Sequence, residues 1–569
     1  MQGMDEAVVL LVITGALAVT AVARHWDLPA PLLLVVVGLG VSLIPAVPHV
    51  ELAPEVLLGV ILPPLLFSAA TGSSYQDFRT SLNAIVRLGV GLVVVTALAV
   101  AWVATILLPD LPFAAALVLG AVVAPPDAVS AAAVGRRLGL PRRVMTLLGG
   151  ESLINDATSL TLYKVALAGV ATGAWVWTEG IGVFALAVVV GVGIGLVMGI
   201  GMHAARLRLA DPLLTSVAGI ILPFAAYWIA EELSGSGVLA VVAAGLYLGH
   251  TAPTAGYETR LVEEPLWDSL DLLLEAITFA LIGLQLKFVV QTVVTSDEGL
   301  RTAVWVSLAA LAVTMAIRPV YVFATSWLDR VHLPGSKRTR ADELGWRESL
   351  VVSSAGMRGV VTLAAAAAIP ATLGGAEFPG RATIQLAAFT VAIGTLLLQG
   401  ATLPWVIRRL GVGGEDEAAS DAAEEARVRR LMAEAQAEAI SRATKEWAPL
   451  IGEEKAEATR AAMSAAIVGR AQAAARLLSP ESEAEEPAEQ APSRARPTGG
   501  RAYPMARLGD RSDDLRRLRA LRADMNRAQR QVLVDERDAG RLNETVMRRI
   551  LRELDIEAEA LAESWVNRI

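Results

Sequence analysis

Long apolar blocks dominate this chain and restrict what it can fold into. They run for roughly 17–25 residues, the length at which a helix crosses the hydrocarbon core of a bilayer. Hydrophobic residues make up 54% of the chain and charged residues 19%, with a mean hydropathy of +0.52. A soluble protein of 569 residues carries more charge. The chain is therefore predicted to be an all-α polytopic membrane protein.

The blocks predict about thirteen transmembrane helices, with boundaries good to a few residues. If the first six and the last six spans form two inverted repeats, the fifth span corresponds to the twelfth. The predicted spans are residues 7–23, 30–44, 54–70, 84–107, 112–134, 144–169, 180–202, 212–230, 236–249, 268–286, 300–327, 348–369 and 383–406.

The fifth and twelfth spans are both interrupted. The fifth contains Pro125 and Pro126 followed by Asp127, and the twelfth contains Gly356 and Gly359. Proline removes a backbone donor and glycine weakens a helix. A broken helix at membrane depth is tolerated only where it lines a cavity or packs inside protein. Matched interruptions in two halves indicate a transport site, whereas two unrelated kinks are the simpler alternative.

Basic residues concentrate in alternate loops, and this asymmetry predicts the orientation in the membrane. An odd number of spans puts the two termini on opposite sides. The C-terminus is therefore predicted to be cytoplasmic and the N-terminus external. The predicted cytoplasmic loops contain Arg24, Arg79, Arg136, Arg137, Arg142, Arg143, Arg206, Arg208, Arg260, Arg330, Lys337, Arg338, Arg340, Arg347, Arg408 and Arg409.

The composition changes beyond Leu410, so residues 1–410 are predicted to form a membrane domain and 411–569 a cytoplasmic helical domain. Within the second domain, residues 479–505 are rich in Pro, Ser and Glu and predict a disordered linker. This domain has no glycine fingerprint for a nucleotide. It is predicted to be a dimerising or regulatory helical domain of the transporter, or else a solvated appendage.

Several kinds of chemistry are not expected. The chain has no cysteine, which excludes disulfides and thiol chemistry, and its five histidines are scattered. The N-terminus lacks the features of a signal peptide, so residues 7–23 are expected to be retained as the first helix. We predict neither enzymatic activity nor a bound cofactor.

Residues 149–156 place two carboxylates and an amide in one predicted span. Ionisable groups inside a membrane are costly and usually mark ion or proton pathways. Glu151 and Asp156 are five residues apart, about 140° around a helix, so they need not share one partner. A hard monovalent cation prefers several oxygen ligands. Asp156, Ser152, Glu151 and carbonyls freed near 124–126 could supply them.

These residues resemble those of the monovalent cation:proton antiporter-1 family, bacterial antiporters related to eukaryotic sodium/proton exchangers. The resemblance implies a secondary antiporter in the bacterial plasma membrane that exchanges sodium for protons, serves pH homeostasis and forms a homodimer. The matching motifs lie at residues 62–67, 149–156, 236–245, 281–286, 355–359, 398–400, 403–404 and 536–554.

The family resemblance also implies individual roles. Asp156 would carry the cation or the proton, and Asn155, as an amide, would go with electroneutral exchange. Arg318 would pair with Glu151. Asp127 and Arg358 would lie at the two helix breaks. Many relatives have a carboxylate at the position of Ser68, where it would pair with the arginine equivalent to Arg358.

Each role has an alternative in which the residue is structural. Asp156 could serve helix packing, and Glu151 is expected to be structural rather than transporting. Asp127 could ligate the cation or neutralise the N-termini of half-helices. Arg358 could cap half-helix C-termini. Lys164 could be a second coupling group, or could extend toward the outer interface.

Two alternative functions stay open. Potassium could replace sodium, because selectivity depends on geometry that the sequence does not give. A protein of another class, a cation channel or a non-transporting sensor, could use the same scaffold. A channel would need a hydrophilic lining or a carbonyl filter, and the spans offer few polar residues to build one.

Overall fold

The computed structural model describes residues 6–562 except 27, 46, 48–55, 174–176, 210, 296–297, 331–343, 374, 414 and 478–510. Its described residues divide into two compact units, Met1–Ala255 with Val262–Gly414, and Gly256–Leu261 with Glu415–Ile569. The second unit thus begins close to the expected boundary but also takes in Gly256–Leu261, at the start of the helix α14 (Tyr257–Val294). The expected disordered linker, 479–505, lies outside the described residues.

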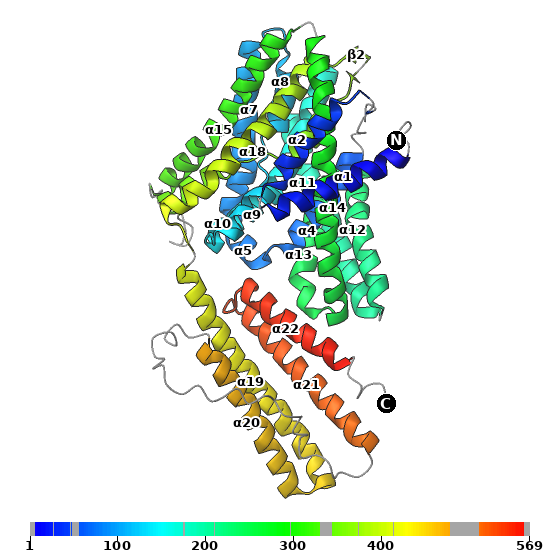
Figure 1. Cartoon of the computed structure of the whole chain (residues 1–569), viewed down its shortest axis with the longest axis vertical. Coiled ribbons are helices and arrows are strands. Elements are labelled where there is room, and N and C mark those ends of the chain that lie inside the picture. The colour runs from blue at the N-terminus through cyan, green and yellow to red at the C-terminus, as the bar shows by residue number, and fades with distance from the viewer. Residues whose placement is uncertain are drawn as a thin grey trace. The chain divides into compact units, whose positions relative to one another are not determined.

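The described part of the first unit is built from helices and one short antiparallel hairpin that pairs Thr372 with Glu377. Figure 1 shows its long helices side by side. The elements of its N-terminal half are α1 (Glu6–His25), α2 (Ala30–Ser42), η1 (Leu57–Ile61), α4 (Leu62–Gly72), α5 (Tyr75–Thr80), α6 (Leu82–Val86), η2 (Arg87–Leu92), α7 (Val93–Leu107), α8 (Phe113–Val123), α9 (Ala128–Arg137) and α10 (Arg142–Thr172).

The chain continues through a second set of long helices that includes the second broken span. These elements are α11 (Trp177–Arg208), α12 (Pro212–Glu232), α13 (Gly237–Thr251), η3 (Ala252–Thr254), α14 (Tyr257–Val294), α15 (Leu300–Arg330), α16 (Trp346–Ser354), α17 (Val360–Ala367), β1 (Thr372–Leu373), β2 (Ala376–Glu377) and α18 (Arg381–Leu410).

Seven helices among the described residues are long and apolar enough to cross a membrane, and four shorter ones are also apolar. α10 is not one of the seven, because Glu151, Asp156 and Lys164 interrupt its apolar sequence. Every predicted span overlaps helix in the structure. The all-α class is confirmed, whereas the count of thirteen crossings stays a prediction.

Both predicted interruptions are present. α8 ends at Val123 and α9 begins at Ala128, while α16 ends at Ser354 and α17 begins at Val360. The two breaks lie against each other, because the Asp127 backbone N–H donates to the Met357 carbonyl over 2.6 Å. The largest apolar core surrounds this region with side chains from α4, α7, α8, α10, α13 and α18.

The described residues of the second unit form four long helices and two apolar clusters. One cluster joins Val428 of α19 (Glu415–Ile451) to Leu533 of α21 (Arg511–Asp538) and Ile550 of α22 (Glu544–Ala562). Arg260, in the first turn of α14, pairs with Asp555 over 2.6 Å within this unit. The helices are α19 (Glu415–Ile451), α20 (Glu453–Leu477), α21 (Arg511–Asp538) and α22 (Glu544–Ala562).

Candidate functional site

The candidate site lies where the middle of α10 crosses the two helix breaks. Pro125 has no N–H, so the helical donor to the Ala121 carbonyl is missing. The Ser159 hydroxyl of α10 donates to that carbonyl instead, over 2.8 Å. One turn earlier, the Asn155 amide donates to the Pro126 carbonyl over 2.8 Å. Two side chains on one face of α10 thus fix it to the broken span.

Both carboxylate oxygens of Glu151 are bound by Arg318 of another helix, α15. These two oxygens accept from the Arg318 guanidinium over 2.5 and 2.8 Å, and both side chains are 1% exposed. Arg318 also donates from Nε to the Val352 carbonyl near the end of α16. Glu151 is therefore neutralised and held, which is the structural role that its expected partner implied.

Asp156 has a different environment, although it lies in the same helix. It is 5% exposed, and its carboxylate accepts no hydrogen bond and forms no ion pair within the described residues. Asp127 lies near enough for the two charges to repel. A buried carboxylate without a partner is costly unless it is protonated or binds a cation.

Asn155 contributes an oxygen beside this carboxylate along the chain. Because a carbonyl can only accept, the bond to Pro126 fixes the amide nitrogen on that side. The Oδ1 atom is then left buried and without a hydrogen-bond partner in the described structure. Ser152 lies one turn before Asp156 on the same helical face. Asp156, Asn155 and Ser152 each bring a side-chain oxygen to this part of α10.

Arginine side chains cap the C-terminal ends of both broken helices. Arg358, 1% exposed, donates to the carbonyls of Val123, Ala124 and Gly356. Arg318 does the same for α16 through Val352. A positive charge at a helix C-terminus is favourable, because the carbonyls there carry partial negative charge. Arg358 therefore has backbone carbonyls as its hydrogen-bond partners.

Asp127 lies at the opposite, N-terminal ends of the half-helices. It directly precedes α9, and its carboxylate lies against Gly359, which directly precedes α17. A Cβ atom on Gly359 would come within 2.2 Å of the Asp127 Oδ2 atom, so only glycine allows this approach. The position suits a carboxylate that offsets two helix N-termini.

The proposed ligands do not form a compact acidic cluster. No group of three acidic or histidine side chains suited to a metal ion occurs among the residues that the structure describes. Of the four residues expected to surround the cation, Glu151 is held by Arg318, while Asp156 and Ser152 share a face of α10. Asp127 approaches from the break.

Two acidic residues of α14 did not emerge from the sequence. Ser68 of α4 donates a hydrogen bond to Asp271, so a carboxylate reaches this position from another helix. One turn later, Glu275 lines a cavity of about 70 Å³ with Arg24 and Thr20, and is close enough to Asp127 for their charges to repel. The sequence does contain a signal for these two residues: Asp271 and Glu275 are four residues apart in an apolar span, which puts two carboxylates on one face of a membrane helix.

Comparisons with known proteins identify the family of this chain. Residues 8–409 match the family described as sodium/hydrogen exchanger, transmembrane. An uncharacterised Na⁺/H⁺ exchanger of Mycobacterium tuberculosis is 36% identical over 414 residues, covering 70% of this chain and 74% of the relative. A Na⁺/H⁺ antiporter of Aphanothece halophytica is 31% identical over 413 residues, covering 72% and 75%.

The fold is shared with a solved structure. The sodium proton antiporter of Methanocaldococcus jannaschii at pH 8 superposes with a TM-score of 0.55 at 19% identity, covering 71% of this chain and 97% of that one. The chain is thus a multi-pass membrane protein and not an enzyme. It belongs to the sodium/hydrogen exchanger family, whose members exchange cations for protons across membranes.

Proposed function

We propose that this protein exchanges sodium or lithium for protons across a bacterial plasma membrane, with an external N-terminus and a cytoplasmic C-terminus. One observation carries the proposal: Asp156 is a buried carboxylate without a hydrogen bond or ion pair in the described structure. Such a group must hold a proton or a cation, and cannot hold both. Competition for one carboxylate couples the two fluxes.

The ligands proposed for the cation are oxygens of Asp156, Asn155 and Ser152. The unpartnered Oδ1 of Asn155 supports its inclusion, and hard cations prefer such oxygens. We assign Glu151 to the structural pair with Arg318. Asp127 is proposed to offset the half-helix N-termini and to attract the cation electrostatically. Homodimerisation, lipid contacts and a role in pH homeostasis stay predictions.

Exchange is proposed to be electroneutral, one sodium for one proton. Glu151 stays paired with Arg318, and the residue beside Asp156 is an amide, Asn155. In this proposal Asp156 is therefore the single carboxylate that exchanges a proton for a sodium ion. Such a cycle moves no net charge. A membrane potential supplies about 2.3 kcal/mol per charge per 100 mV only to cycles that move charge.

Potassium is the second candidate substrate. A relative in Bacillus pumilus, 29% identical and covering 66% of this chain and 57% of the relative, is named a sodium, potassium, lithium and rubidium/H⁺ antiporter. Membership of the exchanger family favours either antiport over a channel or a sensor.

Proteoliposomes test these proposals when sodium, lithium and potassium gradients are applied separately and proton movement is recorded. We expect sodium and lithium to drive saturable proton flux that reverses when the gradients are swapped. A flux driven by potassium alone would reject sodium as the substrate. If potassium proves inert, a potential set with valinomycin should leave the sodium-driven rate unchanged. Sodium uptake driven by that potential would instead require a second charge-carrying group.

A further inference from the structure

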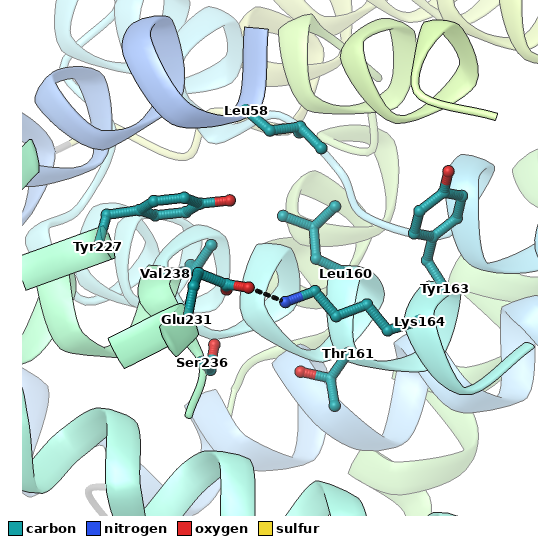
Figure 2. A pocket seen from close by; sticks show the side chains of 9 residues that line it. All are labelled: Leu58, Leu160, Thr161, Tyr163, Lys164, Tyr227, Glu231, Ser236 and Val238. Carbon is teal, nitrogen blue, oxygen red and sulfur yellow. Dashed lines mark hydrogen bonds and ion pairs between the residues drawn. The ribbon is translucent and has the colours of Figure 1, made fainter. Parts of the chain in front are cut away.

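Lys164 of α10 forms an ion pair with Glu231 at the end of α12. Figure 2 shows the two side chains meeting beside Tyr227 and Ser236. The second oxygen of Glu231 accepts from the Gly237 backbone N–H over 3.1 Å. Glu231 therefore ties the start of α13 to the end of α12, and Lys164 connects α10 to that corner.

The ion pair and the proposed carrier belong to one row of side chains along α10. Asp156, Leu160 and Lys164 are spaced by four residues, so each is about 40° around the helix from the one before, and Lys164 is about 80° from Asp156. At 1.5 Å per residue, Lys164 lies about 12 Å along the helix from Asp156. It is displaced toward the Thr172 end, which the proposed orientation makes external.

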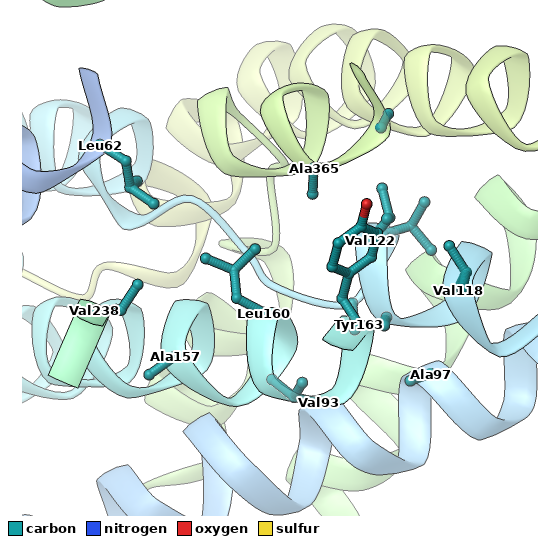
Figure 3. Packing of buried hydrophobic residues seen from close by; sticks show 14 of the residues in the cluster. Leu62, Val93, Ala97, Val118, Val122, Ala157, Leu160, Tyr163, Val238 and Ala365 are labelled. Atoms are coloured by element: carbon teal, nitrogen blue, oxygen red, sulfur yellow. The ribbon is translucent and has the colours of Figure 1, made fainter. Parts of the chain in front are cut away.

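An apolar layer separates the ion pair from Asp156. Leu160 is 6% exposed and belongs to the buried cluster that contains Leu62 and Val238 (Figure 3). The cavity beside the pair has a volume of about 40 Å³, room for only a few water molecules. Its lining includes Leu160 and Thr161 on the helix that carries Asp156.

We propose that the Lys164–Glu231 pair is a latch which, with Leu160 beneath it, closes the route between Asp156 and the Thr172 end of α10. The proposal rests on the proposed function, in which Asp156 carries the ion. Lys164 and Glu231 come from helices that must separate for an ion to pass between α10 and the α12–α13 corner. Opening that side therefore breaks the pair.

The exposure of the pair suits a contact that opens in every cycle. The Lys164 and Glu231 side chains are 51% and 26% exposed. An ion pair this exposed changes the equilibrium constant between the closed and the open arrangement by at most about fivefold. The buried Glu151–Arg318 pair, at 1% exposure for both side chains, is suited instead to a contact that persists.

Cysteine labelling tests the latch, because the natural chain contains no cysteine to compete. Thr161→Cys places a thiol of similar size in the cavity wall, and Val238→Cys, at another residue that lines the cavity, gives a second reporter should the first fail to fold. The full-length protein is reconstituted in vesicles, and a charged, membrane-impermeant methanethiosulfonate is added on the Thr172 side. Thr172→Cys, at the exposed end of α10, is the matched control.

In the Thr161→Cys background, we expect Lys164→Met to raise the labelling rate of the introduced thiol about two- to fivefold. Glu231→Gln, which keeps an acceptor for Gly237, should have the same effect, and combining the two changes should exceed neither alone. Labelling of the thiol introduced by Thr172→Cys should not change. An unchanged rate at position 161 with either change, or additive effects of the two, would overturn the latch. Labelling does not require exchange, so absence of antiport would count against the proposed function alone.

Discussion

Asp156 and Glu151 lie in one helix, yet only Glu151 has a partner of opposite charge among the described residues. Replacing Asp156 with Asn keeps the shape of the side chain and removes the charge. We expect exchange to be lost while membrane insertion and detergent stability stay normal. Asp156→Glu should retain partial exchange, because a competing carboxylate remains. Sodium-driven proton movement in proteoliposomes measures exchange by both variants. Robust flux in the Asp156→Asn variant would remove Asp156 from the mechanism.

The Glu151–Arg318 pair gives a second prediction at the residue scale. Removing one member leaves an unpaired buried charge, which costs roughly 3–5 kcal/mol. Glu151→Ala and Arg318→Ala should therefore lower the detergent melting temperature more than a double variant with apolar replacements. The exposed Lys164–Glu231 pair is the control, and its single variants should change melting little. Additive effects at positions 151 and 318 would show that the two residues do not interact.

The two broken helices behave as one structural element, because the Asp127 N–H donates to Met357 across the breaks. Gly359 has no Cβ atom, and the Asp127 carboxylate occupies the space where one would be. Gly359→Ala must therefore displace either the backbone at position 359 or the Asp127 carboxylate. We expect a loss of about 1–3 kcal/mol, as for other overpacked sites, together with weaker cation-dependent exchange. Thermal unfolding in detergent measures the loss of stability, and proteoliposome assays measure the weaker exchange.

Gly149→Ala is the matched control for this element. Gly149 lies in α10 with nothing within 4 Å of an added Cβ atom, and alanine is the better helix former. Its stability should be unchanged or slightly higher. Equal effects of the two substitutions would mean that the contact between Asp127 and Gly359 does not limit the geometry of the breaks.

At the scale of the whole molecule, the first unit contains the complete candidate site. Val412, 8% exposed, packs into its second apolar core, so a truncation should retain it. We expect a chain ending at Gly413 to insert, remain monodisperse in detergent and exchange ions, with a shifted pH dependence or dimer stability. Loss of insertion would show that the C-terminal helices are needed for folding.

The second unit has its own acid-sensitive contact. Arg541 and Arg427 donate hydrogen bonds to Glu536 and lower the pKa of its carboxyl to about 2. A lowered pKa in the folded state stabilises the unit above the unfolded value of about 4.3. That stabilisation is lost as the pH falls through about 2. Pepsin cleavage within residues 415–562 of the full chain should therefore increase between pH 4.5 and 2.

Glu536→Gln is the control for the acid response. The variant lacks the titrating carboxyl, so its tail should be cleaved faster at pH 4.5, and its cleavage should depend less on pH over the same window. An identical pH profile in the natural chain and the variant would show that this contact does not govern the acid stability of the second unit.

Sequence patterns alone determined the class of this protein, because spans, helix breaks and the 149–156 motif are local properties of the chain. Apolar length specifies a membrane helix, and Pro125, Pro126, Gly356 and Gly359 specify where two of them are interrupted. The family resemblance added the expected pairing of Glu151 with Arg318, 167 residues away.

Only the tertiary structure decided which polar groups are satisfied. Ser68 meets Asp271 across 203 residues, and Arg358 meets the Val123 carbonyl across 235. Lys164 likewise meets Glu231 across 67 residues. Whether a buried charge is neutralised depends on which helices pack together, and helix packing is not encoded in local periodicity. For that reason the sequence identified Asp156 as a candidate, while the absence of a partner for it among the described residues became visible only in the folded chain.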